Sequence, residues 1–407
     1  MIYKFGNIIL LLLLAYGICI ASPVKQSVKF EEYTVFDGNI GWQNDGTTYR
    51  LACAALITEC SNGDLICGWL SGSGTEPATD NCFMTSVSKD GGITWSVPTI
   101  MIPASDMAGI VTNFHKTKDG RLVAFGAKWP SDKEYTQWHY FKLTSDDNGV
   151  SWSQPQDFVL YGNHGYIGGG PIYLENGKCL YVGGFFDKRD TPLNGDVVAL
   201  AIAADEAQAL SVKPQADLNK QQMPGKFGDY LHGCCAYIAG DDASVDFEKC
   251  GHIANRPLGL LEPAAVQLND GRIVMLMRAE WGGFLWRSES MDNGRTWSPA
   301  EQTDIPNPSC LPFLLKLPDG RIALIHNPSG GKVGERGPRS PLSVWVSSDN
   351  MKTWEIKQDI ASGGKLAYPN GIIYKDQLVF VYDKNRREVK YVKLDFAANE
   401  GIEINDK

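Results

Sequence analysis

Ser88-Lys89-Asp90-Gly91-Gly92-Ile93-Thr94-Trp95 is a stretch that the chain repeats. The shared pattern is S-x-D-x-G-x-[TS]-W, and three further copies begin at Ser145, Ser290 and Ser347, the last with Met351 in place of the glycine. In such a stretch the aspartate can accept backbone N–H groups, the glycine supplies a positive φ, and the tryptophan buries its ring beside the next strand. One copy would carry little weight, but four copies predict a hairpin corner that recurs along the chain.

The spacing of the copies predicts how many units the chain contains. Trp95 and Trp152 are 57 residues apart, Trp297 and Trp354 are also 57 apart, and the 145 residues between the two pairs leave room for two units without an intact copy. A remnant lies at 244–248, where no tryptophan follows. Strand-like alternations are also closed by Asn-Gly or Asp-Gly turns, at 61–64, 118–121, 175–178, 269–272 and 318–321. Short strands repeated in this way predict an all-β fold, a six-bladed β-propeller that forms a single domain over 22–407.

The two ends of the first forty residues have different predicted roles. Lys4, the apolar run from Ile8 to Ala15 and the small residues before Ser22 are typical of a secretory signal peptide over 1–21, which predicts a secreted or periplasmic protein. A lipoprotein anchor at Cys19 is the alternative, although the bulky Ile18 fits it poorly. The apolar run is too short to span a bilayer comfortably, so no membrane span is expected. We expect Val28 to Phe36 to supply a strand that closes the ring against the last blade.

Composition excludes several classes of function. The net charge is -9 and no block of Lys or Arg could follow a phosphate backbone, so nucleic-acid binding is not expected. The nine cysteines after Cys19 form no C-x-x-C pair, and the six histidines show no metal-ligand spacing, so neither a metal site nor a cofactor is predicted. The cysteines could pair in an exported protein or serve as small core residues, and the sequence leaves this open.

Two kinds of motif together resemble one family. The four copies are similar to the Asp-boxes of the sialidase superfamily, and Tyr49-Arg50-Leu51 resembles its N-terminal motif Phe/Tyr-Arg-Ile-Pro, with Ala52 in place of the proline. The resemblance extends from Tyr49 to about Val392, nearly the whole mature chain. It implies a sialidase-like propeller that acts on sialylated or other acidic glycans.

The resemblance also implies an arginine triad that binds the substrate carboxylate. Its members would be Arg50, Arg278 and Arg339, with Arg336 close enough to Arg339 to be a rival. Guanidinium groups keep their charge at any working pH and meet a carboxylate in planar, bidentate geometry. A single arginine is more often part of a solvated surface ion pair, and the placement of all three relative to the boxes is what favours the triad.

Three further residues match the catalytic positions of the family. Asp80 resembles its acid/base aspartate, with Glu76 on the same loop as the alternative. Glu262 resembles the glutamate that activates the nucleophile, and Tyr368 resembles the nucleophilic tyrosine, although Pro369 and Asn370 differ from the usual neighbours. Each of these residues could instead be structural, as a turn cap, a surface glutamate or a core aromatic.

These residues predict a retaining exo-α-sialidase. A tyrosine stays neutral until its proton leaves, so it approaches the carboxylate-bearing anomeric carbon without charge repulsion, and sialidases are known exceptions to the usual carboxylate pair. Three alternatives remain: a propeller glycosidase or lyase that acts on another acidic sugar, a carbohydrate-binding propeller without turnover, and a propeller that binds protein partners. A propeller that binds protein partners would show apolar rim patches instead of convergent arginines.

Overall fold

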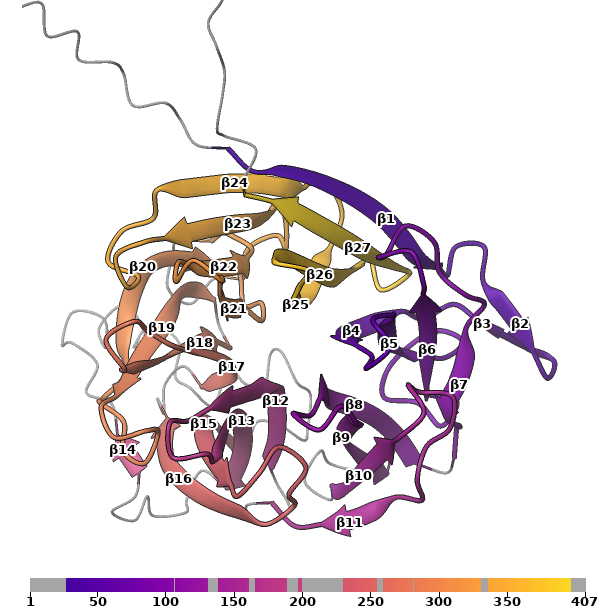
Figure 1. Cartoon of the computed structure of the whole chain (residues 1–407), viewed down its shortest axis with the longest axis horizontal. Helices are drawn as coiled ribbons and strands as arrows, with labels where there is room; N and C mark the ends of the chain where they lie inside the picture. Colours follow the sequence, from indigo (N-terminus) through magenta and orange to yellow (C-terminus); the bar gives the residue numbers. More distant parts are fainter. Residues whose placement is uncertain are drawn as a thin grey trace, which may run out of the picture.

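Six β-sheets surround a central axis in the computed structural model (Figure 1). The structure describes residues 27–105, 107–130, 138–160, 165–188, 197–199, 230–254, 259–280, 282–330 and 336–396. These residues contain strands and no helix, and each sheet is one blade of a propeller. The prediction of an all-β, six-bladed propeller is therefore confirmed.

The first three blades follow one another along the chain, innermost strand first. Blade 1 consists of β4 (Cys53–Glu59), β5 (Leu65–Ser71), β6 (Cys82–Ser88) and β7 (Thr99–Ile102). Blade 2 consists of β8 (Met107–Lys116), β9 (Leu122–Pro130), β10 (His139–Ser145) and β11 (Gln156–Phe158). Blade 3 consists of β12 (Gly165–Tyr173), β13 (Cys179–Lys188), β15 (Tyr230–Ala239) and β16 (Phe247–Ala254), with β14 (Val197–Ala199) parallel to β16.

The last three blades complete the ring. Blade 4 consists of β17 (Leu260–Gln267), β18 (Ile273–Ala279), β19 (Gly283–Ser290) and β20 (Glu301–Asn307). Blade 5 consists of β21 (Phe313–Lys316), β22 (Ile322–His326), β23 (Leu342–Ser347) and β24 (Ile356–Ala361). Blade 6 consists of β25 (Leu366–Tyr374), β26 (Gln377–Lys384), β27 (Glu388–Asp395) and, as its outer strand, β1 (Lys29–Asp37). A short hairpin of β2 (Trp42–Asn44) and β3 (Thr47–Tyr49) links β1 to blade 1.

The N-terminal strand closes the ring, as predicted. β1 runs antiparallel to β27 from the pair Lys29 and Asp395 to the pair Asp37 and Glu388. Because the outer strand of blade 6 comes from the other end of the chain, no turn joins β27 to β1, and blade 6 has no place for an Asp-box. The prediction that two blades without a box lie between Trp152 and Trp297 is therefore wrong. Blade 3 is the one blade without a box in that interval, and blade 6 is the second blade without a box. Residues 189–196 and 200–229, inside blade 3, and the predicted signal peptide at 1–21 lie outside the described residues.

The core is divided among the interfaces between blades. Each of the six interfaces holds one cluster of buried apolar residues. Between blades 2 and 3, for example, Phe125 packs edge-on against Tyr181 with ring centroids 5.8 Å apart. All nine described cysteines are buried and none is paired with another, so they act as small core residues. Each blade is thus stabilised by apolar area buried against its two neighbours.

The Asp-boxes satisfy their own polar groups. In the first box Asp90 accepts hydrogen bonds from Ser88 Oγ at 2.8 Å, Thr94 N at 2.9 Å and Thr94 Oγ1 at 2.6 Å. The hydrogen bonds from Thr94 lower the pKa of Asp90 to about 2. Gly92 has a φ of +96°, and a Cβ there would lie 2.2 Å from the Tyr391 ring of the preceding blade. In the fourth box Met351 adopts a φ of 62° without being glycine, and its side chain is buried between blades 4 and 5.

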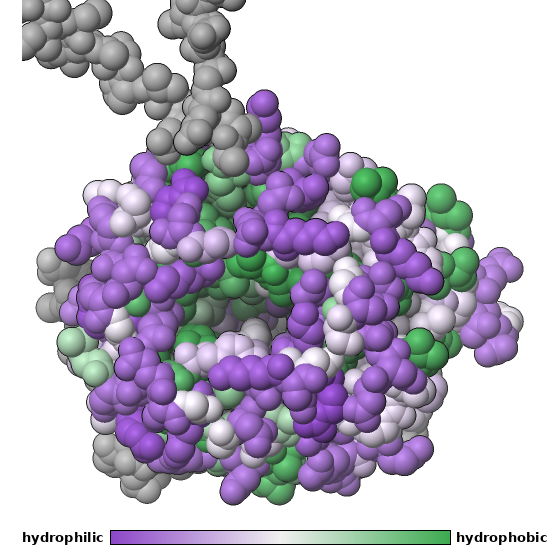
Figure 2. Space-filling view, in the orientation of Figure 1, coloured by the Kyte–Doolittle hydropathy of each residue, from purple (hydrophilic) through white to green (hydrophobic). Residues whose placement is uncertain are grey.

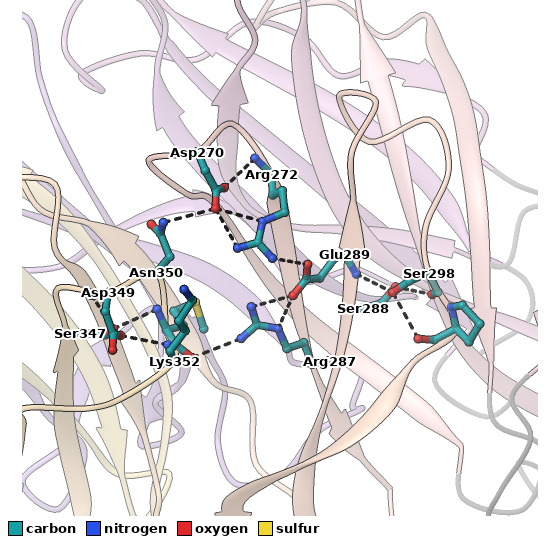
Figure 3. Close-up of polar contacts among 12 residues, drawn as sticks. Asp270, Arg272, Arg287, Ser288, Glu289, Ser298, Ser347, Asp349, Asn350 and Lys352 are labelled. Carbon is teal, nitrogen blue, oxygen red and sulfur yellow. Dashed lines mark hydrogen bonds and ion pairs between the residues drawn. The ribbon is translucent and has the colours of Figure 1, made fainter.

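Charged side chains near the Asp-boxes of blades 4 and 5 pair with one another. Figure 3 shows Arg272 between Asp270 and Glu289, at 2.7 and 2.6 Å, and Arg287 on the other oxygen of Glu289 at 2.7 Å. Asn350, in the fourth box, donates to Asp270 at 3.3 Å. The Asp-Gly turn of blade 4 and the box of blade 5 therefore lie at the same end, which we call the box end.

Candidate active site

A cavity of 990 Å³ follows the propeller axis and is lined by the innermost strands of all six blades. Figure 2 shows a hollow at the centre of one face with apolar side chains on its wall. Four of the charged lining residues come from loops between second and third strands: Glu76 from β5–β6, Arg336 and Arg339 from β22–β23, and Arg386 from β26–β27. These loops lie opposite the box end, at the other end of the propeller, which we call the site end.

Bulges in the innermost strands direct side chains toward the axis. The register of β4, β17 and β25 shifts near the start of each strand, and that of β12 shifts between Gly168 and Ile172. At these shifts Ala54, Gly169, Glu262 and Tyr368 have positive φ angles of 52°, 68°, 47° and 53°. A bulged residue has no partner on the neighbouring strand, so its side chain is re-aimed, and a left-handed conformation costs a non-glycine residue about 1–2 kcal/mol. The chain accepts this strain at two residues predicted to be catalytic.

Tyr368 and Glu262 are in contact at the wall of the cavity. Tyr368 Oη lies 3.4 Å from Glu262 Oε1, and the other carboxylate oxygen of Glu262 forms an ion pair with Arg278. The backbone N–H of Glu262 donates to Tyr166 Oη at 2.7 Å, which fixes the bulge. The negative charge of Glu262, followed by burial, raises the pKa of Tyr368 well above its usual value. The phenol therefore keeps its proton in the resting site, next to a carboxylate that can accept it.

Two of the predicted arginines lie beside this pair. Arg278 donates from Nε to Ser309 Oγ at 3.0 Å, and Arg339 donates to the Ser309 carbonyl at 3.0 Å. The guanidinium of Arg339 is 5.8 Å from the centre of the Tyr368 ring. Burial acts to lower the pKa of Arg278, but the charge of Glu262 outweighs it and the pKa is raised. Arg336, the rival of Arg339, also lines the cavity and donates to the Glu280 carbonyl at 3.0 Å.

Arg50 and Asp80 are not brought to the cavity. Arg50 donates from Nη1 to the carbonyl oxygens of Gly38 at 3.3 Å and Asn39 at 2.9 Å, and so caps the turn that follows β1. Asp80 accepts a hydrogen bond from Ser73 N at 2.8 Å and thereby closes its own loop. Neither residue lines the cavity, whereas Glu76, the alternative on the same loop, does. Local backbone groups therefore hold both side chains outside the lining of this cavity, and their predicted roles stay predictions.

Three functional candidates carry no sequence motif. Arg386 and Lys365 line the cavity, and Arg386 forms a 2.5 Å ion pair with Glu76. Asp383 is fully buried behind them, and burial raises its pKa to about 7. The one signal in the sequence is the adjacent pair Arg386-Arg387, which lies in a turn beyond Tyr368 and resembles any surface turn.

In the described ranges, no group of three or more His, Cys, Asp or Glu side chains could hold a metal ion. No helix in the same part of the chain is long and apolar enough to cross a membrane.

The fold and the charged cavity define a six-bladed β-propeller with a charged axial site. The chain belongs to the family of BNR repeat-like domains, which it matches over residues 63–381. Solved structures similar to it include a protein of unknown function from Dyadobacter fermentans, with a TM-score of 0.65, 14% identity, and coverage of 90% of this chain and 99% of that one.

Two sialidases are similar to the same extent. Hadza microbial sialidase Hz136 has a TM-score of 0.64 and 15% identity, with coverage of 88% of this chain and 67% of the other. Trypanosoma rangeli sialidase, solved with sialic acid, has a TM-score of 0.62 and 15% identity, with coverage of 90% of this chain and 59% of the other. No curated protein matches the sequence. At such identities the likeness establishes the fold, which is that of the sialidase propellers.

Proposed function

We propose that this chain is a retaining exo-α-sialidase that hydrolyses terminal α-ketosidic bonds of sialic acids in glycoconjugates. The observation that carries the proposal is the 3.4 Å contact between Tyr368 Oη and Glu262 Oε1, flanked by Arg278 and Arg339. A tyrosine next to a carboxylate and two guanidiniums suits a substrate whose anomeric carbon bears a carboxylate. We also propose that the chain is exported, because residues 1–21 have the pattern of a signal peptide.

In the proposed reaction Tyr368 is the nucleophile and Glu262 its base. Tyr368 Oη forms the bond to the anomeric carbon as its proton moves to Glu262, and the bond to the leaving oxygen breaks. Water then attacks the anomeric carbon as the bond to Tyr368 Oη breaks, and the carboxylate that protonated the leaving oxygen accepts a proton from the water. Glu262 returns its proton to the phenolate, and the sugar leaves with retained configuration. Arg278 is bound to Glu262 in the free site, and a substrate carboxylate that attracts Arg278 would leave Glu262 more basic when the phenolic proton has to move.

The proton for the leaving oxygen comes, in this proposal, from the β5–β6 loop. Glu76 lines the cavity and Asp80 does not, so a role for Asp80 requires that the loop release the hydrogen bond from Ser73. Glu76→Gln and Asp80→Asn distinguish the two. The variant of the true acid should lose activity mainly toward substrates with poor leaving groups, because a good leaving group needs no protonation.

A second candidate is hydrolysis or elimination at another acidic sugar, such as a uronic acid. The position of Arg50 favours it, because a cavity without that guanidinium differs from the predicted carboxylate-binding triad.

The test is hydrolysis of a fluorogenic α-ketoside of N-acetylneuraminic acid. The wild type should turn over, and Tyr368→Phe should lose roughly a hundred- to ten-thousandfold in kcat. Tyr33→Phe is the matched control, since Tyr33 lies on the outer strand of blade 6 and its hydroxyl donates to Glu31 Oε2 at 3.2 Å. An unchanged kcat in Tyr368→Phe would remove the nucleophile from the proposal. No turnover of the ketoside by a folded wild type, with turnover of a uronide instead, would establish the second candidate.

A further inference from the structure

The cavity contains a guanidinium that no motif predicts. Arg386 lies in the turn between β26 and β27 and lines the cavity, with its Nη2 paired to Glu76. We infer that Arg386 is an anion-binding residue of this cavity and completes, with Arg278 and Arg339, a clamp for the carboxylate of the substrate. The inference rests on the proposed function for the nature of that ligand.

The three arginines surround Tyr368 from three blades. Arg278 is at the end of β18 in blade 4, Arg339 precedes β23 in blade 5, and Arg386 follows β26 in blade 6. The phenolic group of Tyr368 interacts electrostatically with Arg278 and Arg339, and Arg386 in turn interacts with Tyr368. A carboxylate bound beside Tyr368 would therefore face positive charge from all three blades.

The bulge of blade 1 presents no charged side chain to the cavity. The innermost strand of this blade has the same left-handed bulge as blades 4 and 6, but the bulged residue is Ala54, where those blades present Glu262 and Tyr368. A methyl group cannot bind a carboxylate, and Arg50 is turned toward Gly38 and Asn39.

Backbone hydrogen bonds hold the turn that contains Arg386 against the segment that precedes β4 of blade 1. Ala52 N donates to the Arg386 carbonyl at 3.1 Å, and Gly38 N donates to the Arg387 carbonyl at 2.6 Å. Arg386 therefore reaches the cavity next to Ala54, where the bulge of blade 1 contributes no positive charge.

Two carboxyl groups hold the Arg386 side chain. Glu76 contacts it from the cavity side, and Asp383 interacts with it from the buried side, where Asp383 Oδ2 accepts the Ala54 N–H at 3.3 Å. Among the described residues, Glu76 is the hydrogen-bond partner of the guanidinium, through Nη2 alone, and Arg339 likewise donates one bond, to the Ser309 carbonyl. Both guanidiniums keep further N–H groups for a ligand, and both are oriented before it binds.

The test measures binding of free N-acetylneuraminic acid and of its methyl ester by calorimetry. Arg386→Ala should weaken binding of the acid by at least about tenfold and leave the ester, which lacks the charge, nearly unaffected. Arg386→Lys should bind the acid more tightly than Arg386→Ala but more weakly than the wild type, because a point charge replaces the planar guanidinium. Arg50→Ala is the matched control and should bind the acid like the wild type.

The outcomes separate this inference from the proposed function. A hydrolytically active wild type whose affinity for the acid is unchanged by Arg386→Ala would overturn the inference and leave the sialidase proposal intact. Weaker binding of the acid in Arg386→Ala, in a wild type without turnover, would support the clamp and overturn hydrolysis. Loss of affinity in Arg50→Ala but not in Arg386→Ala would return the role to Arg50. If Arg386→Ala unfolds, the doubly neutral Glu76→Gln/Arg386→Gln variant replaces it, and unchanged acid binding there would equally overturn the inference. A wild type that binds neither N-acetylneuraminate nor glucuronate would overturn it too.

Discussion

The two ends of this propeller treat charge and backbone strain in opposite ways. At the box end, aspartates accept hydrogen bonds from their own turns, arginines pair with nearby acids, and most left-handed positions are glycine or asparagine. At the site end, Arg278, Arg336, Arg339, Lys365 and Arg386 share one cavity, a buried aspartic acid has a pKa of about 7, and left-handed positions hold Ala54, Glu262 and Tyr368.

This difference separates the end of the fold that satisfies its own backbone from the end that forms the candidate site. The box end repeats with small variations because each turn solves a local problem, the satisfaction of its own backbone groups. The site end accepts strained backbone and concentrated positive charge, which are typical of sites that must bind and act on a ligand. Variants at the two ends should therefore differ in the sign of their effect on stability.

The largest difference is expected from Asp383→Asn. Burial raises the pKa of Asp383 from 3.8 to about 7, so the folded state holds a proton that the unfolded state loses above pH 4. Stability is therefore full below about pH 4 and falls as the pH rises to about 7, by up to about 4 kcal/mol for three pKa units. In Asp383→Asn this fall should disappear, as measured by urea unfolding at pH 5 and pH 8.

The control for this slope is a carboxyl group in water. Asp45 lies exposed at the tip of the β2–β3 hairpin, and Asp45→Asn should retain the wild-type dependence on pH. A slope that persists unchanged in Asp383→Asn would mean that Asp383 is ionised at neutral pH and paired with Arg386 and Arg339.

A smaller effect of opposite sign is expected from Asp292→Ala in the third box. Asp292 accepts hydrogen bonds from Ser290 Oγ at 2.8 Å, Thr296 N at 2.9 Å and Thr296 Oγ1 at 2.6 Å. Burial acts to raise the pKa of Asp292, but the hydrogen bonds from Thr296 outweigh it and the pKa is lowered, so its contribution is present near neutral pH and is lost as the pH falls below 4. Its removal should cost about 2 kcal/mol of unfolding free energy.

Activity should separate this variant from the site. Asp292→Ala lies at the box end, so kcat measured well below the lowered midpoint of unfolding should match the wild type. Glu301→Ala, at an exposed position at the start of β20, is the control for surface substitution in the same blade and should leave stability within about 0.5 kcal/mol. A large loss of kcat in Asp292→Ala would show that the two ends are coupled.

The box end and the ring could be predicted because their information is local. The four boxes, the Asn-Gly and Asp-Gly turns and the strand before Tyr49 each depend on residues that are neighbours in sequence, and the structure places them as hairpin corners and as β1. The count of six was right for a partly wrong reason. A blade closed by the N-terminus cannot carry a box, and the interruption between Lys188 and Tyr230 lengthened blade 3 until it resembled two blades.

The site could be predicted only where a motif fixed both position and direction. Glu262, Tyr368 and Arg278 were predicted from motifs, and they lie together in the structure because Glu262 and Tyr368 are at bulges and Arg278 is near the end of β18. Arg50 and Asp80 have suitable positions, but hydrogen bonds with nearby backbone groups turn their side chains away. Arg386 was missed because its approach to blade 1 depends on backbone contacts between residues more than 300 positions apart, which no local pattern records.

The smallest expected effect tests the strain itself. Ala54 has a φ of 52°, which costs an alanine more than a glycine, and its side chain takes no part in the proposed chemistry. Ala54→Gly should stabilise the protein by about 0.5 kcal/mol, since relief of the strain exceeds the added freedom of the unfolded chain. Gly271→Ala is the matched change at the box end, where φ is +87° and a new Cβ would meet nothing within 4 Å, and it should destabilise by about 1 kcal/mol. If Ala54→Gly is instead destabilising, the bulge in blade 1 is held by the Ala54 side chain and not merely tolerated, and the strain at Glu262 and Tyr368 would have to be judged in the same way.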